Sequence, residues 1–140
     1  MKSVFKTILV VSMLCICVFC LVSCDNGIKR DEAKATINEF FAAVVAEDYD
    51  KAESLLHPER PADAEAFFSK VENAENIDFQ AGIEVEKYTG FSSALYDSTV
   101  NGPTYELTMR TKVGDRKVIF TIEIVKNENG YGIYNINLDT

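Results

Sequence analysis

Apolar residues follow two different spacings along this chain, and the change between them divides it into two regions. In residues 33–45 they recur every three or four positions, at Ala33, Ile37, Phe40, Phe41, Val44 and Val45. This spacing gathers them into one stripe and predicts an amphipathic helix. Asp31 is a candidate N-cap for this helix, and Glu47-Asp48 ends the apolar pattern.

Two shorter helices are predicted next. The first is expected to begin at Asp50, with Glu53 three residues later as in a capping box. It ends at His57-Pro58, because the residue before proline is disfavoured in helical geometry. Pro61 suits the first turn of the second helix, whose expected apolar face comprises Ala64, Phe67, Phe68 and Val71.

The second region alternates with a period of two, which predicts strands. Within residues 79–91, one side carries Phe79, Ala81, Ile83 and Val85. Residues 92–100 fit either an edge strand or a loop, and residues 101–103 (NGP) form a turn. Gly114-Asp115 is a two-residue hairpin loop between strands at residues 104–113 and 116–126. That loop sets three apolar pairs: Met109 with Phe120, Leu107 with Ile122, and Tyr105 with Ile124.

The last hairpin is expected to turn through a three-residue loop, residues 128–130, with glycine where a left-handed conformation is needed. This loop is favoured over a two-residue loop, because a one-residue slip would turn the strand over. The pairs it predicts are Ile124 with Tyr134, Ile122 with Ile136, and Phe120 with Leu138.

The predicted fold class is therefore α+β, with N-terminal helices packed on one face of a curved antiparallel sheet. The inward face is expected to carry Tyr105, Leu107, Met109, Phe120, Ile122, Ile124, Tyr134, Ile136 and Leu138. The outward face is mostly polar, interrupted by Ile119, Val125 and Ile133, with Val125 expected opposite Ile133. These three residues form a candidate homodimer face, although so small a patch also fits a monomer, and both states stay open.

The first part of the chain has the order of a secretory signal. Lys2 and Lys6 supply positive charge, and residues 8–22 are apolar except for one serine. This run is shorter than the roughly 20 residues that a membrane-spanning helix needs. It closes on residues 21–24 (LVSC), which resemble the lipobox of bacterial lipoproteins. The alternative is an ordinary signal peptide followed by a chance cysteine.

The lipobox resemblance implies a diacylglycerol thioether on Cys24, cleavage after Ser23, and usually acylation of the new amine. Two or three acyl chains anchor a protein stably. The expected organisation is a signal peptide over residues 1–23, a lipidated Cys24 and tether over 24–30, and one domain over 31–140. The protein is then held on the cell membrane, facing outside the cytoplasm, while inner and outer membrane stay open.

The positions of the cysteines and the net charge exclude several kinds of site and partner for that domain. The other cysteines, Cys15, Cys17 and Cys20, all lie in the signal, so the mature chain offers no disulfide, no cysteine zinc site and no thiol nucleophile. All 22 acidic residues follow the signal, whereas Lys2 and Lys6 belong to it, so the mature chain is more acidic than the whole sequence at −8. Nucleic acid and anionic lipid headgroups would repel it, and no nucleic-acid partner is expected.

Three segments resemble the opening of cystatin-like domains of the nuclear transport factor 2-like superfamily. They are residues 39–43 (EFFAA), 48–52 (DYDKA) and 55–59 (LLHPE), and residues 131–134 (YGIY) are similar to the family's last strand. The superfamily includes ketosteroid isomerases and many bacterial lipoproteins. The resemblance implies a cone in which a long and a short helix lean into a curved sheet and leave a pocket.

No residue matches a catalytic position of that superfamily, since the expected inward face carries no Asp, Glu or His. The only histidine, His57, is interpreted as a helix-end residue satisfied by backbone groups, with a role at a pocket mouth as the alternative. The candidate pocket residues are His57, Tyr105, Met109 and Tyr134. A lone histidine without cysteines does not predict a metal site, and no cofactor is expected.

Three functions are considered. The favoured one is a non-enzymatic envelope lipoprotein that binds a small apolar ligand or a protein partner. The second is an interaction module whose cone is filled by its own side chains. The third is an isomerase or dehydratase that uses the cone pocket, and resemblance of fold alone does not assign it.

Overall fold

The computed structural model describes residues 27–140, so the expected signal peptide and Cys24 lie outside the described residues. Helices come first along the chain and strands follow, as expected for an α+β domain. The four strands form one antiparallel sheet in chain order, with β1 and β4 at its edges. The elements are α2 (Arg30–Val45), α3 (Tyr49–Ser54), α4 (Ala64–Glu75), the 3-10 turn η1 (Phe79–Ala81), β1 (Ile83–Asp97), β2 (Gly102–Val113), β3 (Arg116–Asn127) and β4 (Gly130–Asp139).

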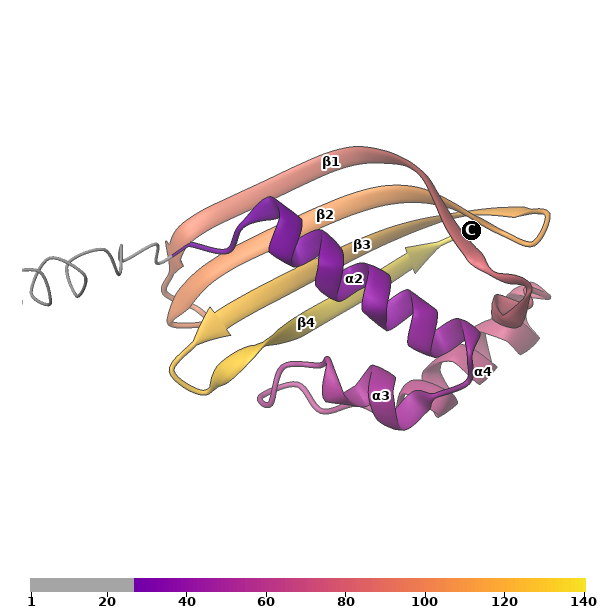
Figure 1. Ribbon diagram of the computed structural model, residues 1–140, viewed down its shortest axis with the longest axis horizontal. Coiled ribbons are helices and arrows are strands. Elements are labelled where there is room, and N and C mark those ends of the chain that lie inside the picture. The colour runs from indigo at the N-terminus through magenta and orange to yellow at the C-terminus, as the bar shows by residue number, and fades with distance from the viewer. Residues whose placement is uncertain (1–26) are drawn as a thin grey trace, which may run out of the picture.

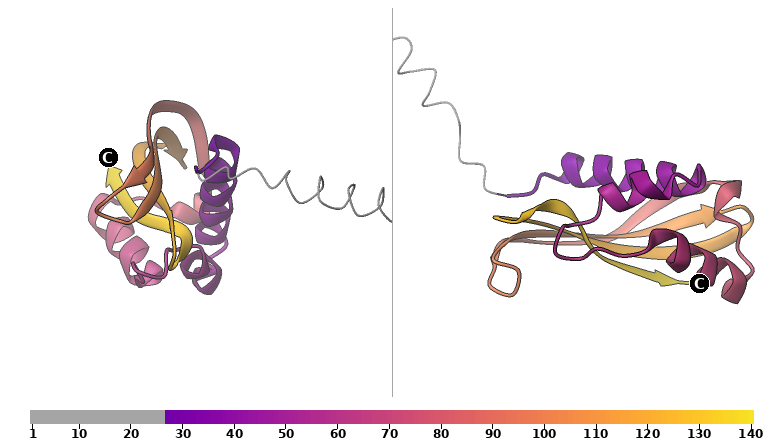
Figure 2. Two further views of the ribbon diagram at one scale, coloured as in Figure 1. Left: turned by 90° about the vertical axis from the view of Figure 1, so that its left-hand side faces the viewer. Right: turned by 90° about the horizontal axis from the view of Figure 1, so that it is seen from below.

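The helices cover one face of a curved sheet. Figure 1 shows α2 lying across the sheet, with α3 and α4 beside the β4 edge. Aromatic rings join the layers: Phe41 of α2 lies 4.9 Å from Phe120 of β3, and Phe68 of α4 lies 5.0 Å from Phe79, centroid to centroid. The views in Figure 2 show the same layering from the end and from below. The α+β class with helices on one face of an antiparallel sheet is confirmed.

The helix starts differ from those expected. Asp31 lies in the first turn of α2, where its charge favours the helix dipole, and Lys29 is the N-cap. Asp48, not Asp50, caps α3 by accepting a hydrogen bond from Lys51 N at 3.1 Å. Pro61 lies in the preceding loop, because Asp63 caps α4 by accepting from Ala66 N at 2.8 Å.

Glu53 does not close a capping box on its own helix. Its carboxylate accepts a hydrogen bond from Ala64 N at 2.9 Å, at the start of α4. The side chain thus satisfies one of the free N–H groups that every helix start exposes. Glu53 connects the two short helices instead of capping the first.

The first strand is displaced toward the C-terminus relative to the expectation. Residues Phe79–Ala81 form a 3-10 turn, and β1 begins at Ile83. It continues to Asp97, so the edge-strand alternative holds for residues 92–97, and a turn follows before Gly102. Three irregularities interrupt its pairing with β2. Such bulges keep an edge strand from presenting a flat surface to other chains.

The register of β2 and β3 is confirmed, and that of β3 and β4 is confirmed in part. Met109 pairs with Phe120, Leu107 with Ile122, and Tyr105 with Ile124. The expected pairs of Ile122 with Ile136 and Phe120 with Leu138 are also present.

The expected pairing of Ile124 with Tyr134 is wrong. The β3–β4 loop has two residues, because Asn127 lies opposite Gly130, and Ile124 pairs with Ile133. An irregularity at Tyr134 then restores the expected register toward the end of β4. A bulge inserts one extra residue on one strand, and here it leaves Tyr134 without an opposite residue on β3.

Candidate functional site

His57 lies at the end of the short segment that follows α3, with no exposed surface. Its Nδ1 accepts a hydrogen bond from Glu59 N at 3.2 Å. Its Nε2 lies 3.2 Å from both Asn127 Oδ1 and the Gly130 carbonyl oxygen. Because Nδ1 accepts, the ring proton sits on Nε2 and is shared by these two acceptors. Both ring nitrogens are satisfied inside the fold, but the expected helix end at His57 is wrong, because α3 ends at Ser54 and one of the partners is the Asn127 side chain.

Asn127 extends this network to three loops. Its Nδ2 donates to Glu59 Oε2 at 2.7 Å and to the Val100 carbonyl at 2.9 Å. Its Oδ1 also accepts from Asn129 N at 2.9 Å, and Asn129 Nδ2 donates to Glu59 Oε1 at 2.8 Å. The hydrogen bond from Asn127 is the main cause that lowers the pKa of Glu59, and the hydrogen bond from Asn129 adds to it.

This network fastens the loop after α3 to the β1–β2 and β3–β4 turns. The roles of Glu59, Asn127 and Asn129 are not predictable from the sequence, since each alone resembles an ordinary turn or loop residue. The backbone of the same loop pairs with β4, because His57 N donates to the Ile133 carbonyl and Ile133 N donates to the Leu55 carbonyl. These bonds hold the loop in place beside β4, where it lines the pocket described next.

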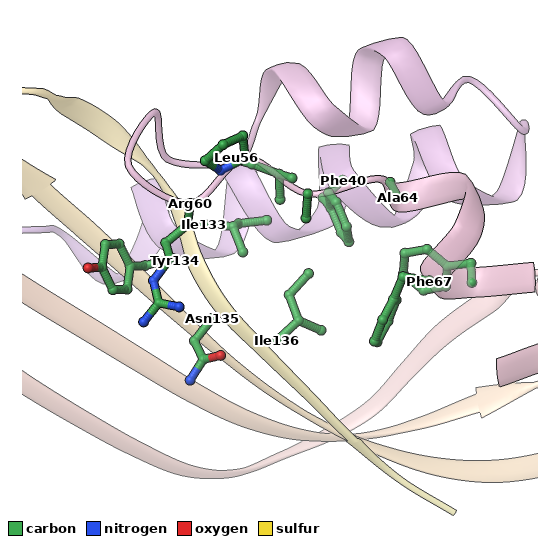
Figure 3. Close-up of a pocket in the computed structure, with 12 residues that line it drawn as sticks. Phe40, Leu56, Arg60, Ala64, Phe67, Ile133, Tyr134, Asn135 and Ile136 are labelled. Atoms are coloured by element: carbon green, nitrogen blue, oxygen red, sulfur yellow. The ribbon is translucent and has the colours of Figure 1, made fainter. Parts of the chain in front are cut away.

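The pocket lies between α4 and β4 and has a volume of about 250 Å³. Figure 3 shows Phe40, Phe67 and Ile136 around it, with Arg60 and Asn135 toward one end. Most of its lining is apolar, and the polar side chains belong to Arg60, Tyr134 and Asn135. The other lining residues are Leu56, Pro61, Ala62, Ala64, Phe68 and Ile133.

Phe67 makes the outer wall of this pocket. It is 37% exposed, whereas its neighbour Phe68 is fully buried. Adjacent residues on a helix point about 100° apart, so the two rings cannot both enter the core. Their succession in the sequence is the signal that could have indicated an apolar surface beside α4.

Arg60 supplies the positive charge at the pocket. Its guanidinium carbon lies 4.7 Å from the centroid of the Tyr134 ring. Within residues 27–140, no carboxylate forms an ion pair with Arg60. An arginine that stacks on an aromatic ring presents its donors in a fixed plane. The arrangement can hold an apolar body between α4 and β4 and an acceptor group, such as a carboxylate, beside Arg60.

The four candidate pocket residues are not brought together. Tyr134 lines the pocket, while His57 packs against it from behind, with ring centroids 5.4 Å apart. Tyr105 and Met109 are 7% and 0% exposed and belong to the core. The expected position of the pocket is therefore wrong, since large apolar side chains fill the inner face of β2 and β3, and the cavity opens at the β4 edge.

The candidate dimer face is not formed as expected. Val125 pairs with Gly132, not with Ile133, because the bulge shifts the start of β4. Val125 and Ile133 are 0% and 1% exposed, which leaves only Ile119 on the surface, at 42%. A single exposed isoleucine is ordinary surface.

In the part of the chain that the structure describes, no helix is long and apolar enough to cross a membrane. Those same residues contain no group of three or more histidines, cysteines and carboxylates that could hold a metal ion. Comparisons with known proteins gave no match: no protein-family model, curated protein or solved structure matched this chain.

Proposed function

We propose that this protein is a lipid-anchored binding protein of the bacterial envelope, which takes a small, mainly apolar ligand between α4 and β4. The observation that carries the proposal is the pocket of about 250 Å³ with apolar walls and with Arg60 stacked on Tyr134 at one end of it. Pockets for small molecules combine apolar lining with a few placed polar groups. The ligand class that fits is a compact apolar molecule with one anionic or strongly accepting group.

The anchor belongs to the same proposal. Residues 21–24 (LVSC) close an apolar run of signal-peptide length, and Cys24 is the residue that would carry the lipid. The domain is then attached to the cell membrane on the side away from the cytoplasm. We also propose a relationship to cystatin-like domains, which the order of helices before a curved antiparallel sheet supports.

The proposed activity is binding, not catalysis. General acid–base chemistry needs a titratable group within hydrogen-bond reach of the substrate. The side chains that line the pocket include no histidine, aspartate or glutamate. His57 lies next to the pocket, but both of its ring nitrogens are engaged within the fold. The composition of the lining supports a binding role over an isomerase or dehydratase.

Native mass spectrometry tests this proposal. The mature chain from residue 25, purified gently from cells, keeps every described residue and should carry a stoichiometric extra mass. Ile136→Asp places a charge in the pocket wall and should remove that mass. Ile119→Asp, on the neighbouring strand at an exposed position, is the matched control and should retain it.

The outcomes separate the functions. A mass that both aspartate variants retain would locate binding elsewhere and contradict the proposed site. No extra mass, together with no saturable binding of apolar carboxylates, would contradict the binding function and favour a self-filled interaction module.

A further inference from the structure

The most exposed large apolar side chains among residues 27–140 gather at the end of one edge strand. Phe91, Leu95 and Tyr96 of β1 are 66%, 79% and 65% exposed. Leu95 and Tyr96 fall on one of the irregularities in the pairing of β1 with β2. Exposed apolar edge strands invite association with another apolar surface, so the position of this one within the molecule is informative.

Two of these side chains, Leu95 and Phe91, lie against the segment by which the chain enters the domain. A Cβ atom on Gly27 would lie 3.2 Å from Leu95 Cδ2. The guanidinium carbon of Arg30 lies 5.6 Å from the centroid of the Phe91 ring. Ile28, between them in the sequence, is buried and fixes this entry segment to the core. Figure 1 shows the first described residues beside the end of β1, with the C-terminus at the opposite end of the sheet.

The location of this surface places it close to the bilayer, an inference that rests on the proposed lipid anchor. Gly27 is three residues after Cys24. Three residues span at most about 10 Å when fully extended. If Cys24 carries lipid, this end of the domain is therefore held within the headgroup region of the bilayer, and the β2–β3 hairpin points away from it.

We propose that the end of β1 inserts into the membrane interface, with Phe91, Leu95 and Tyr96 as a second attachment beside the lipid on Cys24. Aromatic side chains, tyrosine in particular, favour the level of the headgroups. An acyl anchor combined with a second membrane contact holds a protein more firmly than one contact alone. The partner is thus the lipid surface, and the contact fixes how the domain stands on it.

The charges near this end favour an apolar contact over an electrostatic one. Arg30 is followed by Asp31 and Glu32 in the first turn of α2, and Asp97 ends β1. With both signs present and a net acidic chain, attraction to anionic lipid is weak. The insertion is accordingly expected in zwitterionic bilayers as well.

Spin labelling of the lipidated protein in phosphatidylcholine vesicles tests the proposal. The mature chain has no cysteine besides Cys24, so one introduced cysteine is labelled cleanly. Ser98→Cys places the label in the exposed turn after β1 and leaves the three apolar side chains intact. Asp115→Cys, in the hairpin at the far end of the sheet, is the matched control.

The readout is the collision rate of each label with dissolved oxygen, which concentrates in lipid, and with a water-soluble nickel chelate. We expect the oxygen-to-chelate ratio at position 98 to exceed that at position 115 severalfold. Replacing Phe91, Leu95 and Tyr96 together with serine should remove this difference while the protein stays on the vesicles through its lipid. An equal ratio at the two positions in vesicle-bound protein would overturn the proposal.

Two further outcomes are distinguishable. Dipolar broadening between labels at position 98 would show that a second copy of the chain covers the surface, and would overturn membrane insertion. A mass for the purified protein without acyl groups would overturn the lipid anchor and this inference with it. Neither result would bear on ligand binding between α4 and β4, which the pocket variants measure separately.

Discussion

The guanidinium of Arg60 stacks on the ring of Tyr134, 4.7 Å from its centroid, at the end of the pocket between α4 and β4. Tyr134 lies at the bulge in β4 and has no opposite residue on β3. A cation on an aromatic face is stabilised by about 0.5–1 kcal/mol at exposed sites. The stack therefore holds the positive charge where a ligand's acceptor group would meet it.

Replacing Arg60 with glutamine should weaken binding of anionic apolar ligands and spare their neutral analogues. A hydrogen bond to a charged group contributes about 1.5–3 kcal/mol, so an affinity loss of about ten- to a hundredfold is expected for the anion. Isothermal titration with a carboxylate and its methyl ester measures both. Arg110→Gln, at an exposed position on β2, is the control and should change neither affinity. Equal losses for acid and ester would contradict a charge contact.

Gly132 is expected to tolerate no side chain. A Cβ atom there would lie 2.7 Å from His57 N and from the Leu56 carbonyl carbon, where the loop after α3 pairs with β4. Gly132→Ala should lower the free energy of unfolding by about 1–3 kcal/mol, the usual range for overpacking. Gly90→Ala is the control, because its Cβ would meet Thr108 at an ordinary 3.6 Å. Chemical denaturation that finds the two variants alike would contradict the close approach.

Glu59 should make stability depend on pH in acid. Its hydrogen bonds, first with Asn127, lower its pKa from the usual 4.5 in the folded state. Folding therefore favours the ionised form of Glu59. Its contribution to the free energy of unfolding is complete above the unfolded pKa and is lost as the pH falls through the folded pKa. The difference in unfolding free energy between the natural protein and Glu59→Gln should be constant near neutrality and should shrink as the pH falls below the usual 4.5 and through the lowered folded pKa. A gap unchanged in acid would contradict the network.

Glu123, unlike Glu59, should lower stability when it is ionised. It lies opposite Glu106 on the outer face of the sheet, and burial, then Glu106 and Asp97, raise its pKa in the folded state. A raised carboxyl pKa means that ionisation opposes folding. The resulting loss in the free energy of unfolding is present above the folded pKa and absent below the unfolded pKa. Glu123→Gln should stabilise the protein at pH 7 by about 0.5 kcal/mol, the scale of a cross-strand pair, and the gain should vanish in acid.

A double-mutant cycle assigns that effect to the pair. Glu106→Gln alone should also stabilise at pH 7, and the double variant should gain less than the two single gains added together. Thermal unfolding of the four proteins measures the coupling. Strict additivity would show that Glu106 does not contribute to the raised pKa of Glu123.

Most of the architecture follows from local patterns in the sequence. The period-two alternation and the Gly114-Asp115 loop determine the β2–β3 register, because only one pairing places Leu107 opposite Ile122. The bulge at Tyr134 cannot be predicted from the alternating pattern, since the pairing on either side of it is regular. One inserted residue reverses which side chains face inward, and the misplacement of Ile133 and Tyr134 follows from it.

The site is less predictable than the fold, because it is assembled from long-range contacts. The pocket joins Arg60, Phe67 and Ile136 across more than one loop, and no spacing in the sequence connects them. His57 is satisfied within the fold, as expected, but it lies beyond the end of α3, and its partners include the Asn127 side chain as well as backbone groups of Glu59 and Gly130. The turn that a buried side chain contacts depends on how the helices pack against the sheet.

Amide chemical-shift mapping of the mature chain during titration with an apolar carboxylate tests ligand binding between α4 and β4 most directly. We expect saturable shifts that cluster at residues 60–68 and 133–136, while residues 91–96 of β1 stay unchanged. Shifts concentrated on β1, or spread over the sheet without saturation, would contradict the proposed binding site.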